Sequence, residues 1–118
     1  MIIKRFEKAI RCYIDNQHYF DLALKDAAEK MTWYEAKLWC EEHYCRLPMK
    51  HEMKFIAENL DAVNKALVRA GGDELRGYYW SSSEYDHSWA WLCGFGYGYD
   101  FDATNKQTSY YIRPVLSF

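Results

Sequence analysis

The sequence predicts an α+β fold in which two or three helices pack on a small, twisted, antiparallel sheet. Thr32 and Glu35 stand at the spacing of a helix capping box, which marks the start of a first helix. Helical spacing of apolar residues continues up to Gly71 and Gly72, a pair typical of a helix end. From Tyr78 onward, apolar residues recur at every second position, which is the period of a strand.

Length and composition fit one domain over residues 1–118. Half of the 118 residues are hydrophobic, enough for a core without a structural metal or disulfide bridges. The net charge of −2 argues against a nucleic-acid partner. No apolar run reaches the length of a membrane span, and the first residues lack the apolar stretch of a secretory signal. We expect synthesis in the cytoplasm, with later assembly into a particle, or display at a surface through a partner, left open.

The N-terminal segment, residues 2–24, alternates loosely between apolar and polar side chains. Turn-forming residues stand between two strand-like runs, at Asp15-Asn16 and Gln17-His18. We interpret the segment as a strand or hairpin, with a short helix over 4–12 as the alternative.

The first helix is expected to run from Thr32 to about Tyr44. The Thr32 hydroxyl can accept from the Glu35 backbone N–H, and the Glu35 carboxylate can reach back to the Thr32 N–H. Pro48 pushes the residue before it out of helical geometry and so ends the segment. At a spacing of three and four residues, the inward face holds Trp33, Ala36, Cys40 and Tyr44.

Two more helices are expected before the glycine pair. The second covers 49–59, and its buried residues are expected to be Met53, Phe55 or Ile56, and Leu60. The third covers 62–70 with Asp61 as its N-cap, and its inward residues are expected to be Val63, Ala66, Leu67 and Ala70.

Strands and turns are predicted for the last third of the chain. In 89–96 the alternation separates two faces. The expected core face holds Trp89, Trp91, Cys93 and Phe95, and the expected exposed face holds Ala90, Leu92, Gly94 and Gly96. A two-residue turn is expected at Tyr97-Gly98, with a return strand over 99–102 and a loop over 102–106. A final strand over 110–116 is confined to a sheet edge or a bulge by Pro114.

The four cysteines are Cys12, Cys40, Cys45 and Cys93. None forms a C-x-x-C pair, which argues against a zinc or thioredoxin-type site. We expect four free and mostly buried thiols, and a Cys40–Cys45 bridge stays open if the first helix ends promptly.

Aromatic residues concentrate near the C-terminus, where 13 of the 22 lie in residues 78–118. A surface rich in Tyr, with Ser and Gly, is typical of a paratope. Trp33, Trp80 and Trp91 are expected in the core, whereas Trp89 could be exposed at a strand end. Arg113 is expected to be structural and paired with Glu84 or Glu35.

Five segments occur in a characteristic order: Lys30-Met31-Thr32-Trp33-Tyr34-Glu35-Ala36, Arg46-Leu47-Pro48, Tyr79-Trp80-Ser81-Ser82-Ser83-Glu84-Tyr85, Ala90-Trp91 and Ile112-Arg113-Pro114-Val115. Over roughly residues 20–118 the chain resembles C-type lectin fold domains of the formylglycine-generating-enzyme-like kind. It resembles more closely the variable proteins that retroelements diversify in bacteria and their phages. The resemblance implies a single C-type lectin-like domain that binds ligands without catalysis.

The resemblance also implies a variable ligand-binding region over residues 80–104. In such systems an error-prone copying step changes adenines, so that asparagine codons become codons for Tyr, Phe, Ser, Gly, Asp, His, Leu or Ala. Residues of these types without an evident structural role form the expected ligand-binding set: Asp86, His87, Ser88, Leu92, Gly94, Gly96, Tyr97, Tyr99, Phe101, Asp102 and Ala103. The expected partner is a protein or glycan at a cell or particle surface. The alternative is a calcium-independent carbohydrate-binding lectin-like or adhesin domain.

Other chemistry is disfavoured by spacing, and no cofactor or metal is expected. Asp86, His87 and Ser88 are consecutive, so their side chains cannot form a catalytic relay on an extended chain. Asp100 and Asp102 with Asn105 lack the glycine hinge and the bidentate glutamate of a calcium loop. Cys93 lies on the expected core face with no nearby cysteine partner, which disfavours oxidative cysteine catalysis.

Overall fold

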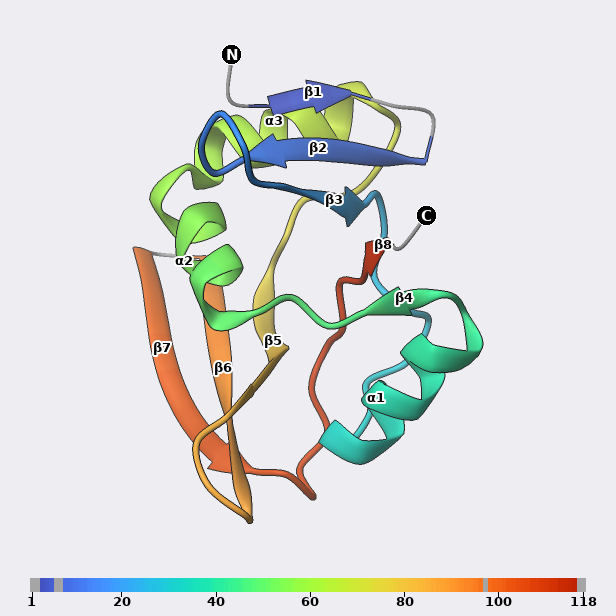
Figure 1. The fold of residues 1–118 in the computed structure, drawn as a ribbon, viewed down its shortest axis with the longest axis vertical. Helices are drawn as coiled ribbons and strands as arrows, with labels where there is room; N and C mark the ends of the chain where they lie inside the picture. Colours follow the sequence, from blue (N-terminus) through green and yellow to red (C-terminus); the bar gives the residue numbers. More distant parts are fainter. Residues whose placement is uncertain (1–2, 6–7, 97, 117–118) are drawn as a thin grey trace.

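The structure, a computed structural model, describes residues 3–5, 8–96 and 98–116. It confirms the predicted α+β class (Figure 1). The elements in chain order are β1 (Ile3–Arg5), β2 (Ala9–Tyr13), β3 (Tyr19–Ala23), α1 (Trp33–Glu42), β4 (Cys45–Arg46), α2 (Lys50–Glu58), α3 (Leu60–Arg69), β5 (Gly77–Glu84), β6 (Trp89–Gly96), β7 (Gly98–Asn105) and β8 (Val115–Leu116).

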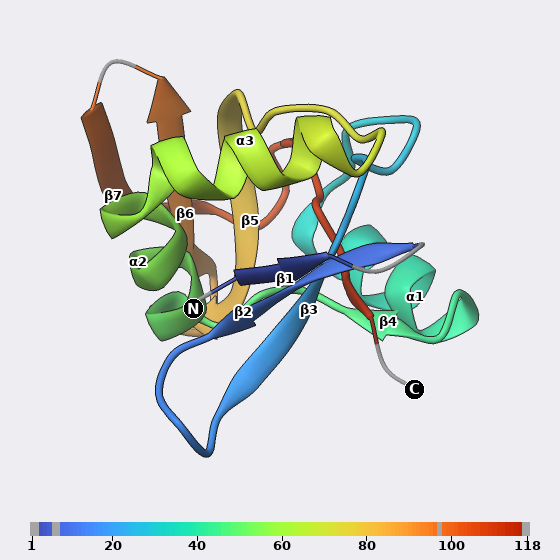
Figure 2. The ribbon, with the colours of Figure 1, turned by 90° about the horizontal axis from the view of Figure 1, so that it is seen from above.

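The described strands form two antiparallel sheets where the sequence predicted one. The first sheet has the order β1-β2-β3-β8-β4, and the second has the order β5-β6-β7. Helix α2 packs against β5 and β6, and α3 packs against β1 and β2. These two helices therefore connect the sheets, as the view from above shows (Figure 2).

The N-terminal segment folds as strands, and the alternative of a helix over 4–12 is wrong. Strand β2 pairs with β1 on one side and with β3 on the other. The turn between β2 and β3 is held by Asp15, whose carboxylate accepts from the backbone N–H groups of Gln17 at 2.7 Å and His18 at 2.8 Å. These hydrogen bonds lower the pKa of the Asp15 carboxyl, and the one from Gln17 has the largest effect.

The capping box at the start of α1 is confirmed. The Thr32 N–H donates to the Glu35 carboxylate at 2.9 Å, and the Glu35 N–H donates to the Thr32 hydroxyl at 3.4 Å. The helix ends earlier than predicted, because Tyr44 has a left-handed φ of 55°. The prediction that Tyr44 faces the core is wrong, since this side chain is 83% exposed.

Helices α2 and α3 follow each other with only Asn59 between them. Asn59 stands at the N-cap position of α3, so the prediction of Asp61 as N-cap is wrong, and Asp61 lies in the first turn. The predicted stop at Gly71 and Gly72 is confirmed, with φ at +88° for Gly71 and a hydrogen bond from the Gly72 N–H to the Leu67 carbonyl at 2.8 Å. Gly72 also lies against Leu24, whose carbonyl oxygen would be 2.5 Å from an added Cβ.

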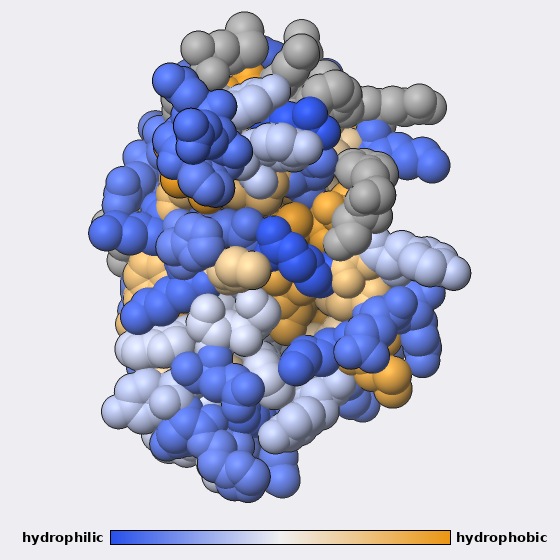
Figure 3. Space-filling view, viewed as in Figure 1, coloured by the Kyte–Doolittle hydropathy of each residue, from blue (hydrophilic) through white to orange (hydrophobic). Residues whose placement is uncertain are grey.

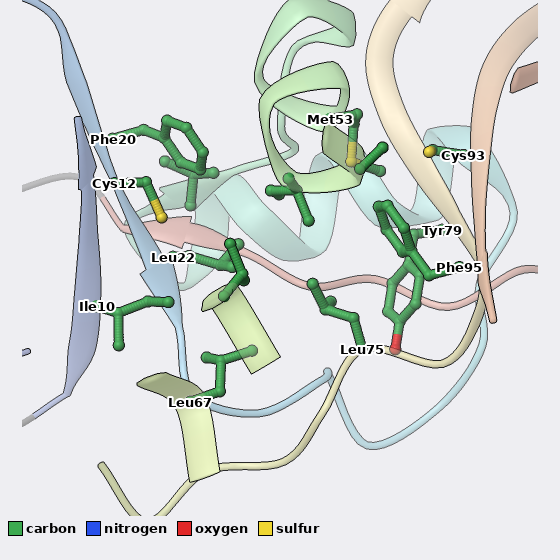
Figure 4. Packing of buried hydrophobic residues seen from close by; sticks show 14 residues of the cluster. Ile10, Cys12, Phe20, Leu22, Met53, Leu67, Leu75, Tyr79, Cys93 and Phe95 are labelled. Carbon is green, nitrogen blue, oxygen red and sulfur yellow. The ribbon is translucent and has the colours of Figure 1, made fainter. Parts of the chain in front are cut away.

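Two core clusters contain most of the buried apolar residues. The first lies between the sheets, where side chains of β2, β3, α2 and α3 meet Tyr79 and Phe95 (Figure 4). The second lies between α1 and the part of the β5–β6 hairpin nearest its turn at 85–88, and it contains Trp33 and Trp80. On the face seen in Figure 1, apolar atoms gather in recesses near the middle and the rest is mostly hydrophilic (Figure 3).

Strand β6 is buried on both faces, which corrects the predicted division into a core face and an exposed face. Cys93 and Phe95 belong to the first cluster, whereas Ala90 and Leu92 belong to the second. The two ends of the strand are exposed, at Trp89 with 44% and at Gly96. Trp91, which was expected in the core, is half-buried.

The C-terminal strands differ from the prediction in length. Strand β7 continues to Asn105, so residues 102–105 are strand and not loop. The predicted strand over 110–116 is reduced to β8 and two isolated bridges, Met31 to Tyr110 and Tyr79 to Tyr111. This segment runs between the two sheets and pairs with each only briefly.

Arg113 is structural as predicted, but its predicted partner is wrong. The guanidinium is 1% exposed and donates through Nε to the Asp26 carboxylate at 2.7 Å. The two residues expected as partners are engaged elsewhere, Glu35 in the α1 cap and Glu84 with the Lys106 ammonium at 2.7 Å. All four cysteines are free, and Cys45 is the one that is half-buried.

Candidate functional site

Every described residue of the predicted ligand-binding set lies in the β5–β6–β7 sheet or in the turn between β5 and β6. Directly paired residues of antiparallel strands share a face. Tyr78 pairs with Gly94, and Gly94 pairs with Asp100, which defines one face, the Tyr78 face. Tyr79, Cys93 and Phe101 lie on the opposite face, which α2 covers and which we call the α2 face.

A hollow of about 670 Å³ opens beside the Tyr78 face. Its sheet wall contains Tyr78, Gly94, Gly96 and Asp100. The opposite wall comes from the start of α3 and the segment before β5, which contribute charged residues, Asp61, Glu74 and Arg76. The hollow therefore offers an aromatic ring, charges of both signs and a stretch of wall without side chains.

The two glycines in this wall are not required by the backbone. Neither Gly94 nor Gly96 has a positive φ. A Cβ at Gly96 would meet nothing within 4 Å. A Cβ at Gly94 would lie 2.6 Å from the Tyr78 ring, so a larger residue there must displace that ring, which is partly exposed. Aromatic side chains often cover a glycine on the neighbouring strand in this way.

Tyr78 is fixed over Gly94 by Asp100. The Tyr78 hydroxyl donates to the Asp100 carboxylate at 3.0 Å. This hydrogen bond, together with the negative charge of Asp100, raises the pKa of the Tyr78 hydroxyl. The sequence reasoning missed both residues as parts of the site. The signal that could have found Tyr78 is its pairing with a glycine across the hairpin, which depends on the register of β5 and β6.

The polar turn between β5 and β6 lies at the other end of the sheet (Figure 1). The Asp86 carboxylate accepts from the backbone N–H groups of Ser88 and Trp89, both at 2.8 Å. The Lys106 ammonium, with 2% side-chain exposure, donates to the His87 carbonyl at 2.9 Å and to Glu84. The turn is exposed but held in one conformation, and Asp86 has a structural role.

The structure divides the predicted set among several places. Gly94 and Gly96 line the hollow beside the Tyr78 face. Asp102 is exposed on the same face, whereas Phe101 and Ala103 are half-buried on the α2 face.

The rest of the set does not join this hollow. Ser88 and Gly96 are separated by roughly 26 Å of extended strand, so the turn with Asp86 and His87 forms a separate surface. Leu92 is 3% exposed, and the prediction that it faces out is wrong. Tyr97 lies outside the described residues, as does the side chain of Tyr99.

Burial makes Cys93 a poor nucleophile. The side chain lies in the first core cluster, and burial raises the pKa of its thiol to about 12. The reactive thiolate is therefore scarce at neutral pH. Among the residues that the structure describes, no group of three or more His, Cys, Asp or Glu side chains is placed to hold a metal ion. Within the same ranges, no helix is long and apolar enough to cross a bilayer.

No protein-family model matches the chain, and neither does any curated protein sequence.

Proposed function

We propose that the protein is a non-catalytic ligand-binding protein with a C-type lectin-like fold, whose binding surface is diversified by a retroelement. The hollow beside the Tyr78 face is the centre of that surface. The observation that carries the proposal is Gly96 in its wall, an exposed strand position where neither the backbone nor packing requires glycine. Gly94 has a packing reason for glycine, because the Tyr78 ring covers it, whereas a Cβ at Gly96 would meet nothing within 4 Å. Variation therefore explains Gly96 better than packing does.

The core supports the lectin-like half of the proposal. Each of the five ordered sequence segments contributes at least one residue to the second core cluster, among them Trp33, Leu47, Trp80, Ala90 and Ile112. Two of the segments also exchange hydrogen bonds, because the Trp33 indole donates to the Ser81 carbonyl and the Trp80 indole donates to the Met31 carbonyl, both at 2.9 Å. These segments therefore act together as a frame that holds the β5–β6 hairpin.

The walls of the hollow suit recognition of a protein or glycan. Tyr78 supplies a rigid ring with a polar end, a side chain common in binding surfaces because it loses little entropy on binding. Asp100 and Asp102 supply exposed carboxylates beside it. A larger side chain at Gly96 would project into the open space of the hollow and change its shape without disturbing the core.

The DNA that flanks the gene tests diversification. We expect a near-copy of the segment that encodes residues 80–118, differing mainly at adenines and lying beside a reverse transcriptase gene. Differences should fall on codons of open positions such as Gly96 and Asp102 and should spare the codon of buried Trp80. If sequencing of the flanking DNA finds no such copy, the retroelement half of the proposal is rejected and the lectin-like or adhesin alternative takes its place.

Replacing Gly96 with tyrosine tests ligand binding at the hollow. The free energy of unfolding is expected to change by no more than about 0.5 kcal/mol, because the position is open. The set of ligands bound on glycan and protein arrays is expected to change, because the new ring fills the hollow. Glu41→Tyr places the same ring at an exposed position of α1 and should leave the array profile unchanged. Identical profiles for Gly96→Tyr and the unmodified protein contradict the proposed site.

A further inference from the structure

A second hollow, of about 500 Å³, lies on the α2 face of the sheet. It is lined by the first two turns of α2, by the end of β5 and by β7, through Lys50, His51, Lys54, Ser83 and Phe101. None of these lining residues is acidic. The hollow shares no lining residue with the one beside the Tyr78 face, and of the predicted ligand-binding set only Phe101 lines it.

The Lys50 ammonium is held in position by aromatic rings. Its Nζ lies 3.5 Å from the centre of the Trp91 ring and 5.8 Å from that of Phe101. The backbone of the same residue is fixed, because its N–H donates to the Ser83 hydroxyl at 3.0 Å. Among the described residues, no carboxylate forms an ion pair with Lys50. The ammonium keeps N–H donors for a ligand, since a cation–π contact does not use them as a carboxylate would.

The positive charge of this hollow is local. The chain as a whole has a net charge of −2, and the hollow on the other face is lined by Asp61, Glu74 and Asp100. Lys54 stands one helical turn after Lys50, so the two ammonium groups flank the same opening. The acidic contact of Lys54 is a long one, 3.9 Å to Glu58, between two exposed side chains, and such a pair is readily exchanged for a ligand.

We propose that this hollow binds an anion attached to a flat ring, with an aryl phosphate as its simplest form. The phosphate lies between the ammonium groups of Lys50 and Lys54, whose two positive charges match the charge of about −1.5 to −2 that a phosphate monoester carries at neutral pH. The Ser83 hydroxyl accepts from the Lys50 N–H, so its own proton can be donated to a phosphate oxygen. The ring packs against Phe101, which provides the apolar part of the lining.

The two charges of this site lie outside the proposed variable region, whereas Ser83 and Phe101 lie inside it and Phe101 belongs to the predicted ligand-binding set. Its two lysines belong to α2, outside residues 80–104. The hollow is open in the present sequence, and a ligand would be held there mainly by charge. The binding of an aryl phosphate therefore neither requires a retroelement nor excludes one.

Titration of the ¹⁵N-labelled protein with phenyl phosphate, followed by NMR, tests the proposal. Saturable shifts are expected at the backbone amides of Lys50, His51 and Ser83. Inorganic phosphate is expected to bind the same amides about tenfold more weakly, because it lacks the ring. Phenol, which lacks the charge, is expected to give no saturable shift there. Absence of saturable shifts with phenyl phosphate, or equal binding of phenol, overturns the proposal.

Variants assign the interaction to the two lysines. Lys50→Gln is expected to weaken phenyl phosphate binding about tenfold, through loss of a charge-assisted hydrogen bond. The matched control is Lys37→Gln, which removes another lysine that lies over a tryptophan, 4.7 Å from the Trp33 ring, and should change binding less than about twofold. Lys54→Gln is a second variant at an exposed side chain, with an expected weakening of about threefold. Unchanged affinity in both the Lys50 and the Lys54 variants contradicts the proposed site.

Discussion

Replacing Arg113 with methionine is expected to lower the free energy of unfolding by about 3 kcal/mol. Methionine keeps much of the apolar stem but removes the buried guanidinium. Nη1 donates to the carbonyls of Ala23 at 3.2 Å and Leu24 at 3.1 Å, in addition to the bond from Nε to Asp26. Each of these acceptors loses the guanidinium in the variant, although the Leu24 carbonyl keeps the Asp73 N–H at 2.9 Å and Asp26 keeps the Tyr79 hydroxyl. The value lies at the low end of the range of about 3–5 kcal/mol for a broken buried pair, because the Asp26 side chain is 28% exposed and regains some water.

Urea unfolding of the Arg113 variant, of Asp26→Asn and of the double variant forms a cycle that isolates the pair. A coupling energy above about 1 kcal/mol is expected between the two sites. Tyr79→Phe is a milder control, because the Tyr79 hydroxyl donates to the other Asp26 oxygen at 3.1 Å. A loss below about 1 kcal/mol for Arg113→Met would show that the guanidinium is not needed to join these loops.

Arg113 also shows where sequence reasoning ends. Its structural role could be predicted, because an arginine beside a proline in a final strand has few other uses. Its partner could not, because Asp26 is 87 positions away and belongs to a connection without regular structure. By contrast, the capping box of α1 and the glycine stop of α3 depend on residues within a few positions of each other, and both were predictable for that reason.

The candidate site likewise contains residues that the sequence alone could predict and residues that depend on distant parts of the chain. That Gly96 belongs to an open surface followed from its composition and strand period, whereas Gly94, also expected to be exposed, is buried under the Tyr78 ring. That Tyr78 and Asp100 complete this surface depends on the register of three strands. The burial of β6 depends on α2 on one face and on α1 and the segment before β8 on the other, all of them outside the hairpin. A strand period alone cannot tell a strand exposed on one face from one covered on both.

Leu92 is the position for which the strand period of the sequence and the structure give opposite results. An exposed, replaceable position would accept aspartate with little change in stability. The structure places Leu92 in the second core cluster with 3% exposure, paired across the hairpin with fully buried Trp80. Removing a buried leucine side chain costs about 2–5 kcal/mol, and an unpaired carboxylate in its place adds the cost of burying a charge. Leu92→Asp is therefore expected to leave the protein largely unfolded at 25 °C.

Circular dichroism and urea unfolding measure this effect, with Leu92→Ala as the milder variant expected to lose about 2–5 kcal/mol. Asp102→Ala is the matched control, because Asp102 pairs with Leu92 on the neighbouring strand but is exposed. Its local hydrogen bond to the Ala103 N–H at 3.0 Å is at the surface, so a change within about 0.5 kcal/mol is expected. A folded Leu92→Asp variant of near-normal stability would return this position to the binding surface. Loss of folding with an unchanged Asp102 variant would remove Leu92 from the replaceable positions and keep Asp102 among them.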